Sequence, residues 1–289
     1  MSGPETGLGN QLWTLAGWLL LTKLHNATLC LPPFTSNIHR EHTRLVPFDD
    51  IFDSTLFISE MSKLKIKIQR NCKHQKYISS TRGWTHYKKS FARQRAFNNG
   101  THPHQYIVMK MYRSLKLSTS MEGVVKYVTR TIGLTSPYAC IHARVEPDIL
   151  YVAKHAPRLS DYNRVAEHLN KSVFWASSFE LNVTGFQSPF KVGFNAQAIY
   201  QNMIFDYLKT SLVDFSICRN AENFVGMGAS SFSRILAEDR SQLGLGWIST
   251  CRNSWTYFNE KQVTTLYKNW SLCPSNKKYT MTSFGWSNY

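Results

Sequence analysis

Helix-like and strand-like segments alternate along this chain, and that alternation is the strongest constraint on its fold. Residues 8 to 24 carry apolar side chains at the i, i+3 and i+4 spacing of a helix face. A short apolar run over 28 to 31 follows and stops at Pro32-Pro33, as a buried strand would. The same order returns beyond residue 118. The pattern predicts an α/β architecture with parallel sheets.

The second half of the chain allows individual elements to be predicted. Ser118 or Ser120 caps a helix that ends at Gly133, and Ser160 caps a later one. The expected elements there are a helix to residue 132, a strand over 138–142, a helix over 161–169, a strand over 173–176, a helix over 195–213, a strand at 224–225 and a helix from Ser230-Ser231.

The first half is less regular. A half-buried strand is predicted over 63–68, where apolar residues alternate with lysines. Two Rossmann-like lobes, 1–115 and 116–289, fit the pattern best. Only six residues precede Gly7, too few for the strand that should support a glycine turn there; we expect either that the chain is N-terminally incomplete or that this strand is absent.

The net charge of +16 calls for a polyanionic partner: nucleic acid, an anionic membrane surface or a phosphorylated substrate. No common nucleic-acid module is visible, so nucleic acid is the disfavoured alternative. The longest apolar stretch, 12–24, is shorter than the roughly 20 residues that a membrane span needs. It has neither the basic start nor the cleavage-like end of a signal peptide.

The six cysteines show no metal-binding spacing. Cys30, Cys140 and Cys218 lie in apolar runs and are expected to be buried thiols, whereas Cys251 and Cys273 form the better disulfide pair. The acidic cluster is best interpreted as turn and helix-cap chemistry, so no metal is expected; it comprises Asp49, Asp50 and Asp53.

Three segments can carry chemistry. Glycines at a strand-to-helix turn, Gly7-Leu8-Gly9-Asn10, let the backbone approach a phosphate, although, taken alone, they are more simply explained by a tight turn with positive φ. His142-x-Arg144-x-Glu146-x-Asp148 directly follows a buried strand, where an α/β sheet binds ligands. Arg144 can bridge two phosphate oxygens, unless it is a surface arginine paired with the neighbouring carboxylates. Residues 224–233 place Ser230 and Ser231 at a helix start, suited to phosphate binding or to ordinary capping.

In this order, the motifs G-x-G-N-Q from Gly7, H-x-R-x-x-x-D from His142 and G-x-x-x-S-S-F from Gly226 resemble the GDP-fucose protein O-fucosyltransferase family and its broader fucosyltransferase relatives. Residues 29–34 match the family's L-x-x-P-P-F. The resemblance fails between roughly residues 55 and 115, and Ala143 stands where the family usually has leucine.

The resemblance implies a GT-B-like fold and an inverting, metal-independent transfer of fucose from GDP-fucose, which is a substrate rather than a cofactor. The acceptor would be a protein serine or threonine hydroxyl or a glycan, and the compartment the lumen of the endoplasmic reticulum or Golgi. The alternative is a catalytically inactive relative of the same fold that binds a GDP-sugar or a glycan.

The family's functional residues carry over as follows. Arg144 would bind the diphosphate, with Asn10 near it or near the acceptor; His142 would line the nucleotide pocket, Asp214 would read guanine, and Ser230, Ser231 and Phe232 would cradle the β-phosphate. Gly7, Gly9 and Asp148 would also take part in binding the donor. Glu146 is the first candidate for the general base and Asp148 the second, but both could instead orient Arg144.

Overall fold

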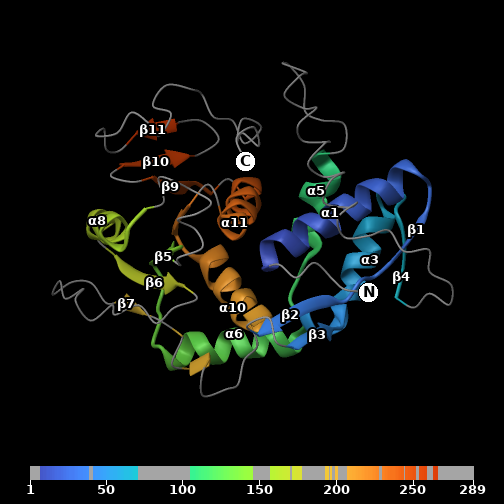
Figure 1. The fold of residues 1–289 in the computed structure, drawn as a ribbon, viewed down its shortest axis with the longest axis horizontal. Coiled ribbons are helices and arrows are strands. Elements are labelled where there is room, and N and C mark those ends of the chain that lie inside the picture. The colour runs from blue at the N-terminus through green and yellow to red at the C-terminus, as the bar shows by residue number, and fades with distance from the viewer. Residues whose placement is uncertain are drawn as a thin grey trace. The chain divides into compact units, whose positions relative to one another are not determined.

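The computed structural model describes residues 7–38, 42–70, 105–145, 157–169, 171–177, 193–194, 196, 199–200, 207–227, 230–243, 245–251, 254–258 and 263–265. The chain divides into two compact units. The first comprises Met1–Val124, Asp206–Ser211 and Gly285–Asn288, and the second Val125–Phe205, Leu212–Phe284 and Tyr289. Figure 1 labels the elements of both.

The first unit is built around one buried helix. Its elements are α1 (Leu8–Leu24), β1 (Thr28–Cys30), β2 (Phe34–Ile38), β3 (His42–Val46), α2 (Phe48–Ile51), α3 (Ser54–Ser62), β4 (Lys67–Gln69) and α5 (Gln105–Ser114). β1 pairs in parallel with β4, and β2 pairs antiparallel with β3. The predicted helix over 8–24 is confirmed. None of the helices in the described ranges has both the length and the apolar character to cross a bilayer.

Gln11 fastens α1 to β2. Its Nε2 donates to the Thr35 carbonyl at 2.8 Å, and its Oε1 accepts from the Thr35 N–H at 2.7 Å. The buried Gln11 amide thus satisfies both backbone polar groups of Thr35, as a neighbouring strand would. Aromatic packing continues this core, with ring centroids 5.0 to 5.8 Å apart among Phe34, Phe48, Phe52 and Phe57. The last residue of the G-x-G-N-Q motif therefore has a structural role.

The strand predicted over 63–68 is wrong in its first half, because α3 ends there in a Schellman motif. The Ile66 N–H donates to the Met61 carbonyl at 3.2 Å and the Lys65 N–H to the Ser62 carbonyl at 2.8 Å, with Lys65 at φ 57°. Ile66 and Met61 are both buried. The apolar alternation belongs partly to this helix end, and β4 begins only at Lys67.

The second unit contains a seven-stranded sheet in the order β11-β10-β9-β8-β5-β6-β7. Strands β9, β8, β5, β6 and β7 run parallel, and β10 and β11 extend the sheet antiparallel. The strands are β5 (Tyr138–His142), β6 (Ser172–Ala176), β7 (Gly193–Phe194), β8 (Asn223–Gly226), β9 (Trp247–Cys251), β10 (Ser254–Phe258) and β11 (Val263–Thr265). The helices are α6 (Thr119–Thr131), α8 (Leu159–Leu169), α10 (Tyr207–Asn220) and α11 (Ser231–Gln242); the starts of α6 and α10 belong to the first unit.

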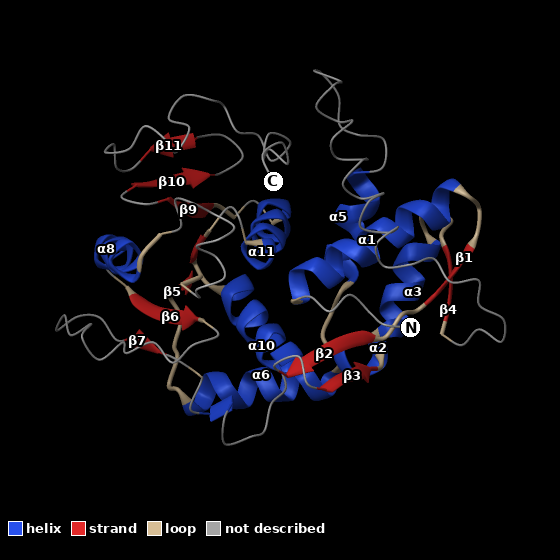
Figure 2. Cartoon of the chain, in the orientation of Figure 1, coloured by secondary structure: helices blue, strands red, loops and turns tan. Residues whose placement is uncertain are grey.

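Helices cover both faces of this sheet, with α8 on one side and α10 and α11 on the other (Figure 2). Alternation along β5 explains the two faces. Ala139, Ile141 and Ala143 join a buried apolar cluster with Tyr162 of α8. The residues between them turn to α10 and α11. The α/β prediction is confirmed.

Two predicted helices differ in their bounds. α10 extends to Asn220, seven residues beyond the predicted end, and most of 195–206 lies outside the described residues. α8 begins at Leu159, so Ser160 is inside the helix; the Asp161 carboxylate accepts the Arg158 N–H at 2.8 Å and closes the helix start instead.

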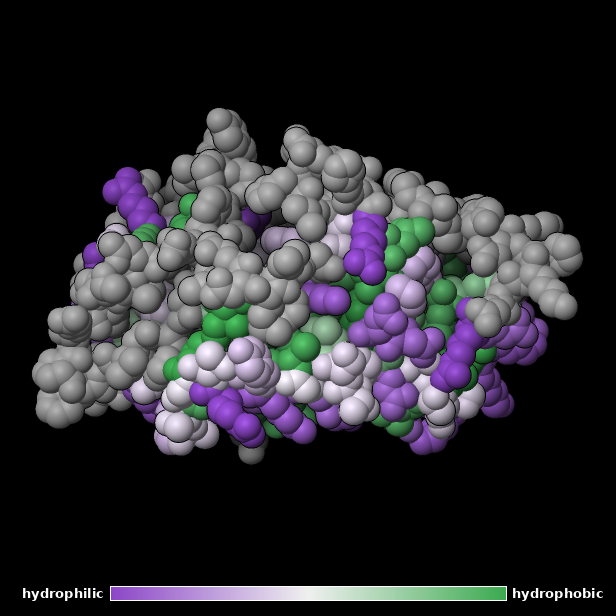
Figure 3. Space-filling view, turned by 90° about the horizontal axis from the view of Figure 1, so that it is seen from below, coloured by the Kyte–Doolittle hydropathy of each residue, from purple (hydrophilic) through white to green (hydrophobic). Residues whose placement is uncertain are grey.

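α6 begins and ends as predicted. The Ser118 hydroxyl accepts the Met121 N–H at 3.3 Å at its start, and Gly133 at φ 67° follows its end. Met121 and Val128 are buried, whereas Lys126 and Arg130 are exposed. Hydrophilic side chains are spread over the described part of the face that is seen from below (Figure 3).

The prediction of buried thiols at Cys30, Cys140 and Cys218 is wrong. Cys140 of β5 and Cys218 of α10 form a disulfide across 78 residues, with Cα atoms 5.0 Å apart, and Cys30 is also disulfide-bonded. Cys140 and Cys218 are buried as predicted, but α10 packs on β5 and brings the two sulfurs together inside the core. The pair Cys251–Cys273 falls outside the described side chains.

Candidate anion-binding site

The strand order of the second unit creates a switch point between β5 and β8. The chain leaves β5 through α8 towards β6, returns through α10 to β8 on the other side of β5, and continues through α11 to β9. Neighbouring connections therefore diverge at the carboxyl ends of β5 and β8, which pair at Ile141 and Val225. In open α/β sheets, ligands bind at this position.

His142 is the last residue of β5 and is 9% exposed. Its Nδ1 lies 2.7 Å from the Ser233 hydroxyl oxygen, and its ring lies 4.5 Å from that of Phe232. Phe232 in turn meets Phe215 of α10 edge-on at 5.7 Å. Burial and, to a lesser degree, the Arg144 charge lower the pKa of His142 to about 3. The imidazole is therefore neutral at physiological pH.

Arg144 follows β5 by two residues and is half-buried. Its backbone N–H donates at 3.3 Å to the hydroxyl of Tyr162, a fully buried residue of α8. This bond fixes the backbone position from which the guanidinium extends. The positive charge of Arg144 contributes to the lowered pKa of His142, so the two side chains interact electrostatically.

The start of α11 adds backbone donors on the same face as His142. The Ser230 carbonyl accepts the first helical bond, from the Arg234 N–H at 3.0 Å, so Ser230 is the N-cap and the helix begins at Ser231. The first N–H groups of a helix have no intrahelical acceptor and carry the positive end of its dipole. A guanidinium, an imidazole and a helix N-terminus together form a site suited to phosphate oxygens.

Gly226 leaves the space in which Ser233 meets His142. The Ser233 hydroxyl also accepts the Met227 N–H at 3.1 Å. A Cβ on Gly226 would lie 2.6 Å from the Ser233 Oγ, 2.8 Å from its Cβ and 2.9 Å from Phe224 Cζ. Glycine is required here by close packing rather than by backbone conformation.

We expect Gly226→Ala to lower the free energy of unfolding by about 1–3 kcal/mol, because neither neighbour can give way without disturbing the core. Gly123→Ala is the matched control: a Cβ there would have no neighbour within 4 Å, and alanine should stabilise α6 by up to about 1 kcal/mol. Urea denaturation measures both. Equal stability of the Gly226→Ala protein and the wild type would contradict this packing.

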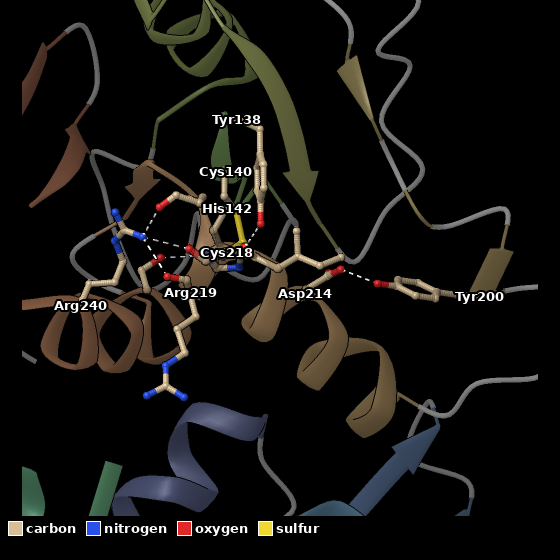
Figure 4. The surroundings of a disulfide bond; sticks show 11 residues. Tyr138, Cys140, His142, Tyr200, Asp214, Cys218, Arg219 and Arg240 are labelled. Atoms are coloured by element: carbon tan, nitrogen blue, oxygen red, sulfur yellow. Dashed lines mark hydrogen bonds between the residues drawn. A yellow bond between two sulfur atoms is a disulfide. The ribbon is translucent and has the colours of Figure 1, made fainter. Parts of the chain in front are cut away.

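Asp214 lies on α10 and accepts a hydrogen bond from the Tyr200 hydroxyl at 2.6 Å (Figure 4). Burial raises the pKa of Asp214 to about 7, and the bond from Tyr200 opposes that rise. Burial, followed by the negative charge of Asp214, raises the pKa of Tyr200. Asp214 thus has a fixed orientation, and its burial disfavours the charged form of the carboxyl group.

The predicted site residues fall into three groups. The ring of His142, at the carboxyl end of β5, contacts Phe232 at the start of α11, next to Ser230 and Ser231, and Arg144 lies two residues beyond His142. Asp214 lies on α10, whose Phe215 packs against Phe232. Glu146 and Asp148 lie outside the described residues.

The remaining predicted residues belong to the first unit. Gly7 immediately precedes α1, and Gly9 and Asn10 lie in its first turn. Gly7 has φ −56°, so positive φ does not explain the glycine there. A Cβ at Gly7 would lie 3.6 Å from the hydroxyl oxygen of Tyr207, in the first turn of α10.

Three contributors were missed from the sequence: Ser233, Tyr162 and Tyr200. Ser233 carries a usable signal, since it is the third residue of a helix that starts beside a strand end. Tyr162 and Tyr200 carry none, because their hydroxyls reach Arg144 and Asp214 only through tertiary packing.

Comparisons with protein-family models and with curated proteins find no match. Solved structures do match. POFUT1 in complex with GDP superposes with a TM-score of 0.57 at 15% identity, over 82% of this chain and 92% of that chain. POFUT1 in complex with GDP-fucose gives 0.54 at 15% identity, over 82% and 91%. NodZ alpha-1,6-fucosyltransferase co-crystallized with GDP gives 0.52 at 12% identity, over 88% and 95%.

The fold is therefore the α/β, GT-B-like fold of these fucosyltransferases. The identities are low, so the likeness concerns the fold alone. Any activity must be argued from the residues of this chain.

Proposed function

We propose that this protein is a metal-independent, inverting glycosyltransferase that transfers fucose from GDP-fucose to a protein serine or threonine hydroxyl or to a glycan. The observation that carries the proposal is the convergence of His142, Arg144 and the N-terminus of α11 at the switch point of the sheet. These groups offer hydrogen-bond donors and positive charge to a diphosphate. The likeness of the fold to GDP-bound and GDP-fucose-bound structures supports this ligand.

In the proposed reaction the acceptor oxygen attacks C1 of fucose while the bond between C1 and the β-phosphate oxygen breaks. GDP leaves with the bonding electrons, and Arg144 with the α11 N-terminus stabilises the charge that develops on the diphosphate. The acceptor proton passes to a carboxylate, with Glu146 as the first candidate and Asp148 as the second.

Asp214 would read the guanine base by accepting hydrogen bonds with its carboxylate. The bond from Tyr200 orients that carboxylate. Asn10 is proposed near the diphosphate or the acceptor, and the turn at Gly7 and Gly9 is proposed to help bind the donor. The remaining donor contacts are proposed in the second unit.

The proposed compartment is the lumen of the secretory pathway. Its support is the disulfide Cys140–Cys218 together with the bonded Cys30, because such bonds persist in oxidising compartments and are rare in the cytosol.

A donor screen tests the function. We expect GDP to stabilise the protein by about 2.7 kcal/mol at a hundredfold excess over its Kd, and UDP to have no comparable effect. GDP-fucose should be hydrolysed faster than GDP-mannose or UDP-sugars. Measurements are thermal unfolding with each nucleotide and the release of GDP or UDP from each sugar nucleotide.

Equal protection by UDP and GDP would contradict a guanine-specific site. Protection by GDP without turnover of any GDP-sugar, and without transfer to glycan or peptide acceptors, would instead indicate a binding relative that has lost the reaction.

A further inference from the structure

Ser233 connects three elements of the second unit at one atom. Its hydroxyl oxygen, on α11, lies 2.7 Å from Nδ1 of His142 on β5 and accepts the Met227 N–H just beyond β8 at 3.1 Å. The residue is fully buried. The hydroxyl hydrogen of Ser233 must therefore have an acceptor inside the protein.

The direction of the bond between Ser233 and His142 follows from counting donors. A serine hydroxyl has one hydrogen to donate, and a neutral imidazole has one nitrogen that donates and one that accepts. If His142 donated from Nδ1, the Ser233 oxygen would accept twice and its own hydrogen would need another acceptor. Among the described residues none other than His142 offers one.

The consistent arrangement is therefore a chain in which the Met227 N–H donates to Ser233 and the Ser233 O–H donates to His142 Nδ1. The imidazole proton is then on Nε2. Within the described part of the chain nothing bonds to Nε2, although His142 is only 9% exposed. This donor belongs to a mostly buried ring that contacts the first turn of α11 and is influenced by the Arg144 charge.

We propose that Ser233 is a positioning residue that holds His142 in the tautomer with Nε2–H, which donates a neutral hydrogen bond to a phosphate oxygen of the nucleotide. This inference rests on the proposed function. It explains how His142 serves an anion without carrying a charge: burial disfavours the imidazolium, and the tautomer supplies the donor instead. Phe232 packs against the ring at a tilt of 35° and restricts its rotation.

The test is the tautomer itself, measured by long-range proton–nitrogen NMR on protein labelled with ¹⁵N-histidine. In the ligand-free wild type at neutral pH, Nδ1 of His142 should give the resonance of an unprotonated nitrogen and Nε2 that of a protonated one. Ser233→Ala should replace this pattern with a mixture of tautomers. His25, exposed at the end of α1, is the internal reference and should not change.

Ser120→Ala is the matched variant, since Ser120 is also a first-turn helix serine but is exposed on α6. It should leave the His142 pattern unchanged. On adding GDP, the Nε2–H resonance should shift in the wild type, and Ser233→Ala should weaken GDP binding by about tenfold, as expected when one hydrogen bond to a charged group is poorly formed.

A wild type with the proton on Nδ1, or a Ser233→Ala protein with the wild-type tautomer, would overturn the proposal. So would GDP binding that leaves the Nε2 resonance unmoved. A wild type in which no resonance responds to GDP would count against the proposed function, and the ligand-free spectra would still decide the role of Ser233.

Discussion

Arg144→Ala is expected to reduce fucose transfer by a factor of about 10²–10³ in kcat/KM, which is roughly 3–4 kcal/mol of transition-state stabilisation, by analogy with the loss of an oxyanion donor. The guanidinium can bind two phosphate oxygens at once and offsets the charge that GDP acquires as it leaves. The fold should persist, because the bond to Tyr162 uses the Arg144 backbone N–H, which alanine retains.

Initial rates with GDP-fucose, together with thermal unfolding, check this expectation. The transfer rate of Arg144→Lys should fall between those of the wild type and Arg144→Ala, since lysine keeps the charge without the planar pair of donors. Arg130→Ala, at an exposed position of α6, is the matched control and should leave both rate and stability near wild type. An Arg144→Ala enzyme with near-normal turnover would remove Arg144 from the proposed site.

Arg240→Ala is expected to destabilise the protein by about 3–5 kcal/mol, the cost typical of breaking a buried charged network. Arg240 is fully buried on α11 and donates to backbone carbonyls at the end of α10, in the turn before β8 and just before β9. The acceptors are the carbonyls of Cys218 at 3.3 Å, Arg219 at 3.1 Å, Ala221 at 2.6 Å, Glu222 at 2.9 Å and Gly246 at 3.3 Å. Alanine would leave these carbonyls buried without their donor.

Urea denaturation gives the change in the free energy of unfolding, and Arg130→Ala again serves as the surface control. Arg240→Lys should recover only part of the loss, because three donors on a flexible stem cannot reach acceptors on several sides. A loss below 1 kcal/mol for Arg240→Ala would mean that water replaces the guanidinium, and that this network is not what holds α10 to β8 and β9.

Arg240 also shows how tertiary contacts override composition. In the sequence it is one of 34 lysines and arginines, which suggest a polyanionic partner when taken together. Arg240, however, is buried and bonded to backbone carbonyls, so it contributes nothing to a binding surface. A second arginine, Arg219, joins α10 to α11: its Nη2 donates a hydrogen bond to Asp239 Oδ1 at 3.0 Å.

Local pattern was enough for the elements that position the site. The apolar run over 138–142 matches β5 at both ends, the helix start at Ser230-Ser231 is confirmed, and α1 follows the predicted periodicity. Such features depend on residues close together in the chain. The prediction failed where two local signals overlapped. Leu64, Ile66 and Ile68 alternate as in a strand, but Leu64 and Ile66 belong to the end of α3, and only Ile68 lies in β4.

By itself, the sequence determined the α/β class, the position of His142 at the end of a buried strand with Arg144 just beyond it, and the serines that open α11. Only the tertiary structure decided that β5 lies beside β8, that Cys140 meets Cys218, and that Ser233 reaches His142. These pairs are separated by tens of residues, and alternation along a strand specifies which face a side chain takes without naming the residue it will meet there. The packing of whole helices and strands decides which residues meet. That packing places the start of α11 beside the end of β5, where Arg144 can become part of an anion site.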